Sequence, residues 1–184
     1  MAHRLVLQYS APMMRRHPTI VIFSLCWLMV EILGATTFPT LAAEDLDGKT
    51  VLLPTGIHGQ TTLLIISFAR KAQNQARDWE EKTCSAIAGR RLNCRQVVVL
   101  EDVPRLFRGF IKSGIAKSVP PQRHSLFCLL FQGEIQLKQI TAYQKEEEAY
   151  LMLLDSTGEI IWQTHGAINE SKRVALAEQL AKAK

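Results

Sequence analysis

The chain has 184 residues, of which 47% are hydrophobic and 21% are charged. This is an ordinary globular composition with room for one domain and one core, and it excludes a disordered tail or a repeat protein. The formal net charge is +5. That charge is too small to imply nucleic-acid binding, and the sequence has neither the aromatic and glycine pattern of an RNA-binding sheet nor zinc-finger spacing.

The first 35 residues have the layout of a targeting segment. Basic residues at 15–16 precede an apolar run over residues 19–33, and small residues follow that run. Because the run is only ~15 residues long, shorter than the ~20 that usually span a membrane, we expect a cleaved signal for export to the periplasm. The mature domain would then begin near Thr36. An uncleaved membrane anchor and a mitochondrial presequence are the alternatives.

The next segment is a strand that passes directly into a helix. Residues 62–68 (TLLIISF) are continuously apolar, which is typical of a central strand buried on both faces. From Arg70 onward the spacing becomes helical. The expected buried stripe of that helix consists of Ala72, Ala76, Trp79 and Thr83. We call residues 68–73, where the strand becomes a helix, the seam.

The rest of the chain continues the alternation of strands and helices. Residues 96–100 read as a second buried strand, parallel to the first through a helical crossover, and a further helix begins near Pro104. A short strand over residues 125–131 and a helical stretch over residues 133–143 follow. The chain then ends with a hairpin and a helix. The hairpin strands are expected at residues 150–155 and 159–164, and the last helix from about Asn169.

Three segments carry a resemblance to a known superfamily. They are the opening FPTLAAEDLDGKTVLLP, the strand TLLIISF and the hairpin YLMLLDSTGEIIW. Together with the order β-α-β then β-β-α, they resemble the thioredoxin-like (redoxin) superfamily over residues 36–184. The resemblance implies an α/β class, a three-layer fold around a mixed central sheet.

Two shorter patterns narrow the resemblance. A segment of the form SFxxxAQ ahead of a tryptophan, and an ending of the form LxDxxGxIxW, are similar to those of the mitochondrial ATP synthase assembly factor family. The matching residues are Ser67, Phe68, Ala72, Gln73 and Trp79, then Leu153, Asp155, Gly158, Ile160, Trp162, Gly166, Glu170 and Leu176. This similarity implies a role in assembling a membrane complex.

The sequence also departs from the superfamily at its redox site. Thioredoxin-like oxidoreductases place two cysteines where the first long helix starts, because the helix amides there depress the thiol pKa. Arg70, Lys71 and Gln73 stand at that position instead. The cis-proline that precedes the hairpin in those enzymes is replaced by Glu148 or Ala149. Thiol–disulfide exchange by the usual mechanism is therefore excluded.

Three cysteines lie beyond the leader, namely Cys84, Cys94 and Cys128. We expect Cys84 and Cys128 to be small buried hydrophobic residues, since free cysteine is among the most buried residue types. A Cys84–Cys94 disulfide is the alternative, favoured by an oxidising compartment. The cysteines and histidines have no metal-binding spacing, so no metal site and no cofactor is predicted.

Two sets of cationic residues are candidate contact sites. One is the seam, where Arg70 and Lys71 oppose the helix dipole, with Gln73 beside them. The other is the helix after Pro104, which carries Arg105, Arg108 and Lys112 among Leu106, Phe107, Phe110 and Ile111. We expect the apolar face of this helix to pack on the sheet. Contact with an anionic membrane surface or a membrane protein is the alternative.

Two functions from different classes remain. The first is a non-catalytic thioredoxin-fold protein, exported or membrane-tethered, that acts by binding another protein and serves as an assembly factor. The second is a thiol-based oxidoreductase or peroxidase that uses Cys84 or Cys94. Thiol reactivity distinguishes the two.

Overall fold

The computed structural model describes residues 37–85 and 92–183. The predicted leader, and the expected mature start near Thr36, lie outside these residues. Within the described ranges no helix is both long and apolar enough to cross a membrane.

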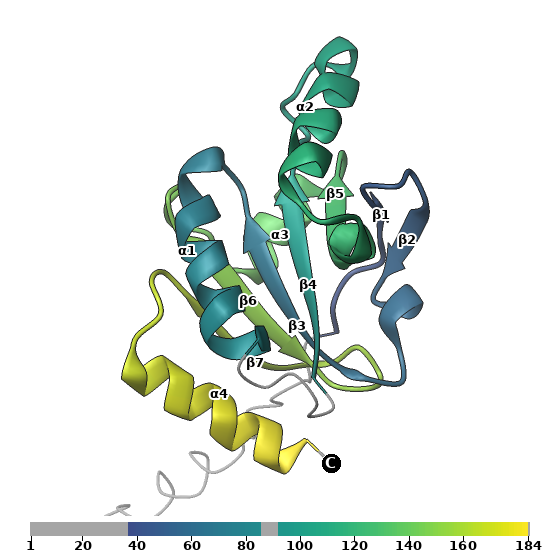
Figure 1. Ribbon diagram of the computed structural model, residues 1–184. Helices are drawn as coiled ribbons and strands as arrows, with labels where there is room; N and C mark the ends of the chain where they lie inside the picture. The colour runs from purple at the N-terminus through teal and green to yellow at the C-terminus, as the bar shows by residue number, and fades with distance from the viewer. Residues whose placement is uncertain (1–36, 86–91, 184) are drawn as a thin grey trace, which may run out of the picture. The chain divides into compact units, whose positions relative to one another are not determined.

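The described chain is built on one mixed sheet of seven strands in the order β2-β1-β5-β4-β3-β6-β7 (Figure 1). The strands β3, β4 and β5 are parallel, whereas β6 pairs antiparallel with β3 and with β7. The predicted parallel pair and the predicted hairpin are thus confirmed. The strands are β1 Leu41–Glu44, β2 Thr50–Leu53, β3 Thr61–Ser67, β4 Leu92–Val99, β5 Phe127–Leu130, β6 Ala149–Leu154 and β7 Ile160–His165.

Helices cover both faces of the sheet, so the predicted three-layer α/β arrangement is confirmed. The helices α1 and α4 pack on one face with Leu63 and Ile65 of β3, and α3 packs on the other with Leu64 and Ile66 (Figure 1). The α-helices are α1 Gln73–Trp79, α2 Arg105–Ser118, α3 Glu134–Ile140 and α4 Glu170–Lys182. Short helical turns are η1 Thr55–Ile57, η2 Arg70–Ala72, the π-helical η3 Glu80–Ser85 and η4 Pro121–Leu126.

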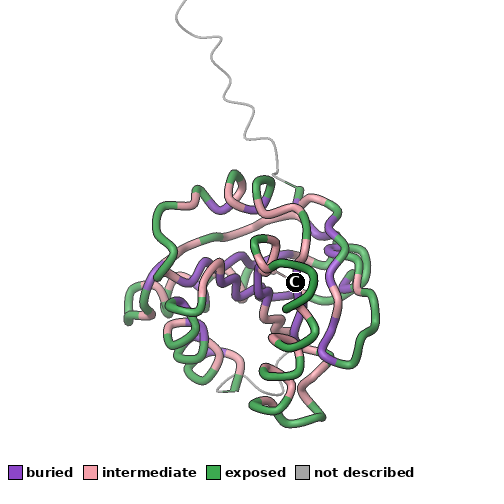
Figure 2. The backbone as a smooth tube through the Cα atoms, turned by 90° about the horizontal axis from the view of Figure 1, so that it is seen from above, coloured by how far each residue is buried: buried purple, intermediate pink, exposed green. Residues whose placement is uncertain are grey.

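The strand β3 is the centre of the core. Its residues from Thr62 to Ser67 are all buried, as the continuous apolar run predicts (Figure 2). Alternate side chains enter two separate clusters. Full burial of each Leu or Ile side chain contributes about 1.5–3 kcal/mol before conformational entropy is counted. β3 thus fixes the position of the seam that follows it.

The helix after the seam buries the stripe that the sequence predicts. The stripe residues Ala72, Ala76, Trp79 and Thr83 are at most 3% exposed. The indole Nε1 of Trp79 also donates a hydrogen bond to the Gly166 carbonyl at 2.9 Å. The opposite face of α1 is exposed. The polar residues Arg70, Lys71 and Gln73 of the seam are therefore left facing solvent.

Candidate functional site

The seam lies at the edge of the sheet where the parallel strands β3, β4 and β5 end. We call this the carboxyl edge. Open α/β sheets bind ligands outside the carboxyl ends of their strands, so this edge is the natural place for a site. From Thr61 to Thr83 the sequence contains no cysteine. The seam therefore offers no thiol to the helix that follows.

The three predicted seam residues, Arg70, Lys71 and Gln73, are all exposed. The Nζ atom of Lys71 lies 2.6 Å from the Oε1 atom of Glu146, with side chains 69% and 51% exposed. This hydrogen bond, together with the charge of Glu146, raises the pKa of Lys71 and lowers the pKa of Glu146. Part of the cationic charge that opposes the helix dipole is thus compensated by a residue 75 positions away.

The segment that enters β6 closes over the seam. The backbone N–H of Ala149 donates to the Oε1 atom of Gln75 on α1 at 3.1 Å. Among the described residues, the one cis peptide is Leu53–Pro54, far from this segment in the chain. The Glu148–Ala149 bond is therefore trans, and the seam and the β6 entry are joined by polar contacts.

An aromatic cluster supports the β6 entry and was not foreseen in the sequence. The ring of Phe68 packs edge-on against Tyr143 and Tyr150, with ring centroids 4.9 and 5.4 Å apart. The Tyr150 hydroxyl accepts hydrogen bonds from the backbone N–H groups of Gln144 and Lys145, at 2.7 and 2.9 Å. These contacts hold the loop that carries Glu146 in place beside the seam.

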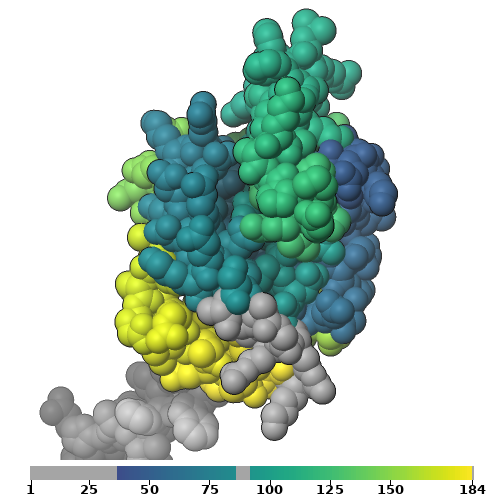
Figure 3. Space-filling model, viewed as in Figure 1, coloured from purple at the N-terminus to yellow at the C-terminus, as the bar shows by residue number. Residues whose placement is uncertain are grey.

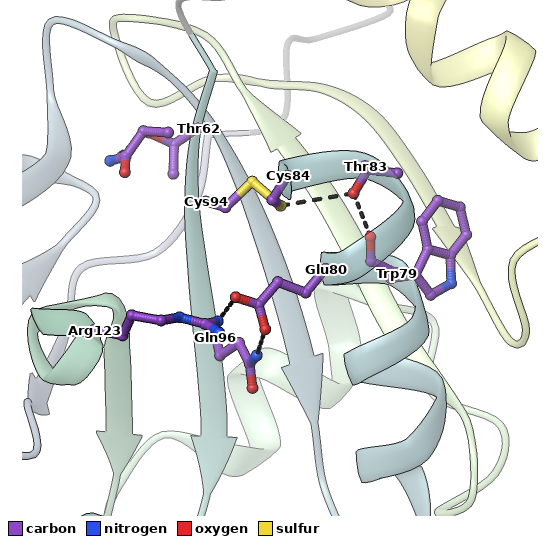
Figure 4. Close-up of a disulfide and its surroundings, with 9 residues drawn as sticks. Thr62, Trp79, Glu80, Thr83, Cys84, Cys94, Gln96 and Arg123 are labelled. Atoms are coloured by element: carbon purple, nitrogen blue, oxygen red, sulfur yellow. Dashed lines mark hydrogen bonds and ion pairs between the residues drawn. A yellow bond between two sulfur atoms is a disulfide. The ribbon is translucent and has the colours of Figure 1, made fainter. Parts of the chain in front are cut away.

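A polar cleft lies beside the seam, between α1 and the segment formed by α2 and η4 (Figure 3). Its volume is about 340 Å³. On one wall the Glu80 carboxylate pairs with the Arg123 guanidinium and accepts a hydrogen bond from the Gln96 side chain (Figure 4). The Glu80 side chain is 14% exposed. Gln73 also lines the cleft, so one predicted residue belongs to it.

The structure joins Cys84 and Cys94 in a disulfide, with Cα atoms 6.1 Å apart (Figure 4). The prediction of an unpaired, buried Cys84 is therefore wrong, and the disulfide alternative holds. The bond ties η3 to the beginning of β4, at the end of α1 opposite the seam. Sequence spacing could not decide this, because two cysteines ten positions apart pair only where the fold brings their Cβ atoms together.

The remaining described cysteine, Cys128, is fully buried in β5, as predicted. Burial raises the pKa of the Cys128 thiol to about 11. A thiolate is the reactive form of cysteine, so Cys128 is chemically inert near neutral pH.

The predicted cationic helix is α2, and its packing differs from the expectation. The side chains of Leu106, Phe107 and Phe110 are 93%, 58% and 80% exposed, so the prediction that they pack on the sheet is wrong. Arg108 instead turns toward its own chain, donating to the Val103 carbonyl at 2.9 Å.

The other two cationic residues of α2 differ from each other. Lys112 forms an ion pair with Glu44, whereas Arg105 is exposed. The guanidinium of Arg108 lies 4.8 Å from the ring centroid of Phe131. The three predicted cations therefore do not form one surface, because two of them bind groups of the same chain.

Within residues 37–85 and 92–183, no three metal-ligating side chains come together as a metal site would require.

The sequence matches no protein-family model and no curated protein. Solved structures are similar to it. One is the thioredoxin domain of the thiol-disulfide oxidoreductase BVU-2223 from Bacteroides vulgatus, with a TM-score of 0.55 and 16% identity over 82% of this chain and 97% of that one. Another is the exposed lipoprotein thioredoxin of Streptococcus pneumoniae, with a TM-score of 0.53 and 15% identity over 78% and 99%.

A third similar structure is BsSco, a member of the Sco family of cytochrome c oxidase assembly proteins. Its TM-score is 0.54, with 11% identity over 80% of this chain and 93% of that one. At these identities the likeness shows the fold alone. The chain has a thioredoxin-like fold, as its sequence predicts, and the link to the ATP synthase assembly factor family stays a prediction.

Proposed function

We propose that this chain is a thioredoxin-fold protein that acts by binding another protein, and not by thiol–disulfide exchange. The observation that carries the proposal is the seam. Arg70, Lys71 and Gln73 occupy the start of the helix where the dithiol of a thioredoxin-like oxidoreductase would stand. A helix start without a nucleophile can bind but cannot exchange disulfides.

The binding surface that we propose is the carboxyl edge around the seam. It presents Arg70, the Lys71–Glu146 pair and the cleft that Gln73 lines. Exposed ion pairs contribute little to stability, so this polar surface is not explained by the needs of folding. Charged and polar groups at an interface give register and specificity, which is the use we assign to them.

We place the protein in an oxidising compartment outside the cytoplasm, as an exported protein or one held by its N-terminal segment. The Cys84–Cys94 disulfide supports this location, because disulfides persist in such compartments and are rare in the cytosol. One protein of the same fold is an exposed lipoprotein. A mitochondrial location remains the alternative.

The partner that we propose is a subunit of a membrane complex during its assembly. BsSco, which has the same fold, is a member of the Sco family of cytochrome c oxidase assembly proteins. An anionic membrane surface is a weaker candidate partner, because Arg108 and Lys112 are bound to groups of their own chain.

The experiment is cross-linked capture of partners by the tagged full chain from detergent-solubilised membranes, comparing three variants. Arg70→Ser/Lys71→Ser should lose the captured subunit, whereas Cys84→Ala/Cys94→Ala/Cys128→Ala, if it folds, should keep it. Arg173→Ser/Lys182→Ser on α4 is the matched control, since Arg173 also forms an exposed ion pair. Capture that depends on the cysteines and ignores the seam would contradict the proposal.

A redox function through Cys84 and Cys94 is the second candidate. It is favoured by the disulfide itself and by the thiol-disulfide oxidoreductase of the same fold. Against it stands the position of the bond, which lies away from the start of α1, where the helix amides would stabilise a thiolate. A disulfide exchange activity that Cys84→Ser/Cys94→Ser abolishes would establish this function.

A further inference from the structure

The N-terminal half of α2 carries apolar side chains that its own chain leaves exposed, although Arg108 turns back toward Val103 and Phe131. Figure 1 shows this half rising beyond the carboxyl edge, while the other half lies against the body through Ile115 and Ala116. No residue of α2 is buried. Leu106 and Phe110, 93% and 80% exposed, are among the most exposed large apolar side chains that the structure describes. An apolar patch of this kind marks an interaction site in a soluble domain.

The free face of α2 consists mainly of apolar and small residues and carries one cation, Lys117. At 100° per residue, Leu106, Phe110, Ser113 and Lys117 fall on one stripe with Gly109 at its border. Arg108 and Lys112 lie on the opposite side, where they bind groups of the same chain. The composition of the free face therefore favours an apolar, closely packed partner over an anionic surface.

Two glycines inside α2 also favour a closely packed partner. A Cβ atom built at Gly109 or at Gly114 meets no heavy atom within 4 Å, and neither residue has a positive φ. Each glycine in a helix interior costs roughly 0.5–1 kcal/mol relative to alanine. Neither the backbone conformation nor the packing of this chain requires them. Close approach of a second helix backbone would require glycine at these positions.

We infer that α2 pairs antiparallel with α2 of a second copy of this chain. In a two-fold arrangement centred between Gly109 and Phe110, each Phe110 lies opposite Gly109 of the other copy, and each Leu106 opposite Ser113. Large side chains thereby meet small ones, which is how helices pack closely. In a two-fold dimer the same surface lies on both copies, so it must be complementary to itself. The stripe of α2 meets this requirement.

The charged residues at the ends of the stripe are compatible with this antiparallel register. Lys117 of one copy reaches the level of the turn that precedes α2 in the other, where the exposed Asp102 lies. The two-fold axis makes this pair twice. No like charges oppose each other along the stripe, since Lys117 is its only charged member within α2.

The contact is small, so the dimer should be weak and reversible. Even an aromatic side chain buries only about 150–250 Å², so Leu106 and Phe110 together fall well below the roughly 800 Å² per partner of a standard interface. This self-association goes beyond the proposed partner binding and does not depend on it, since it uses neither the seam nor the cysteines.

The experiment is sedimentation equilibrium of the full chain in a mild neutral detergent across the micromolar range. We expect a concentration-dependent monomer–dimer equilibrium. Phe110→Glu should weaken the dimer by about tenfold or more. Gly109→Leu should weaken it as strongly while leaving the fold intact or more stable, because its side chain meets open space in the monomer. That second variant separates docking from folding.

The matched control is Ile135→Glu, which places the same charge on a 72% exposed apolar residue of α3. It should leave the dimer unchanged. A chain that stays monomeric throughout, or a dimer that Phe110→Glu and Gly109→Leu do not weaken, overturns the inference. So does a monomer whose binding to phosphatidylglycerol-containing vesicles needs Phe110, since the occupant would then be lipid. If the dimer forms but capture of a partner does not depend on the seam, the proposed function is wrong and the inferred dimer stands.

Discussion

The two ends of α1 are held in different ways. At the seam, the exposed Lys71 pairs with Glu146 at the surface, and in the next turn the half-buried Gln75 accepts a hydrogen bond from the Ala149 N–H. At the far end, Trp79 is fully buried and the disulfide ties η3 to β4. In an oxidoreductase of this fold the reactive thiols would lie at the seam, but here the seam is polar and has no thiol. The disulfide lies at the far end of α1, where it holds the fold together.

This difference assigns a role to each end. Stability should reside at the far end, and contact with other molecules at the seam. Substitutions from Trp79 at the end of α1 back to Lys71 in η2 should therefore have steadily smaller effects on the free energy of unfolding.

The largest effect is expected from Trp79→Ala. The substitution removes a side chain with no exposed surface from the cluster of Leu63 and Ile65, together with the hydrogen bond to the Gly166 carbonyl. We expect a loss of about 3–5 kcal/mol in the free energy of unfolding. Urea unfolding followed by circular dichroism measures it. A loss as small as that of the seam substitutions would show that the far end of α1 does not carry the stability.

The disulfide should come next. Cys84→Ser/Cys94→Ser releases a short loop in the unfolded chain, so we expect a loss of about 2–3 kcal/mol. The control is chemical: dithiothreitol should destabilise the wild-type chain by a similar amount and leave the double variant unaffected. Equal melting temperatures with and without reductant in the wild type would show that the bond does not staple the fold.

A smaller loss is expected from Gln75→Ala, at the seam side of the helix. It removes the acceptor for the Ala149 N–H, and a typical hydrogen bond contributes about 0.5–1.5 kcal/mol. Thermal unfolding measures the loss. Gln144→Ala serves as the control, because its side chain takes part in none of the contacts that hold the β6 entry. A loss larger than that of the disulfide variant would reverse the order of the two ends.

The buried face of α1, the central strand and the hairpin turn could be predicted from the sequence. The stripe of Ala72, Ala76, Trp79 and Thr83 and the run TLLIISF follow from local periodicity, which reports burial directly. The hairpin turn follows from its own residues: Asp155 accepts N–H bonds from Thr157 and Glu159, and Gly158 has φ +89°.

The rest depends on contacts between distant residues. Lys71 meets Glu146 across 75 positions, and Glu80 meets Arg123 only because the fold places η3 and η4 on opposite sides of the same cleft. Leu106 and Phe110 have the periodicity of a packed helix, yet α2 extends past the sheet that would cover them. Periodicity shows which side chains share a face, but it does not show whether anything covers that face.

The smallest effect is expected from Lys71→Met. The ion pair with Glu146 is exposed, so the free energy of unfolding should not change measurably. The pKa of Glu146, now lowered by Lys71, should rise toward 4.5. Any stabilisation from this pair is fully present at pH values above the pKa of a glutamate in the unfolded chain. It disappears as the pH falls through the lowered pKa of Glu146 in the folded chain. NMR titration of the Glu146 carboxyl measures the shift, and an unchanged pKa would mean that the pair does not form in solution.

We claim that this thioredoxin-like fold does not perform thiol–disulfide exchange, and an insulin reduction assay with dithiothreitol and the full chain measures that activity. We predict the rate of dithiothreitol alone, because the seam has no thiol, Cys84 and Cys94 lie away from the start of α1, and Cys128 is buried with a pKa of about 11. An accelerated rate that Cys84→Ser/Cys94→Ser returns to the background would contradict the claim.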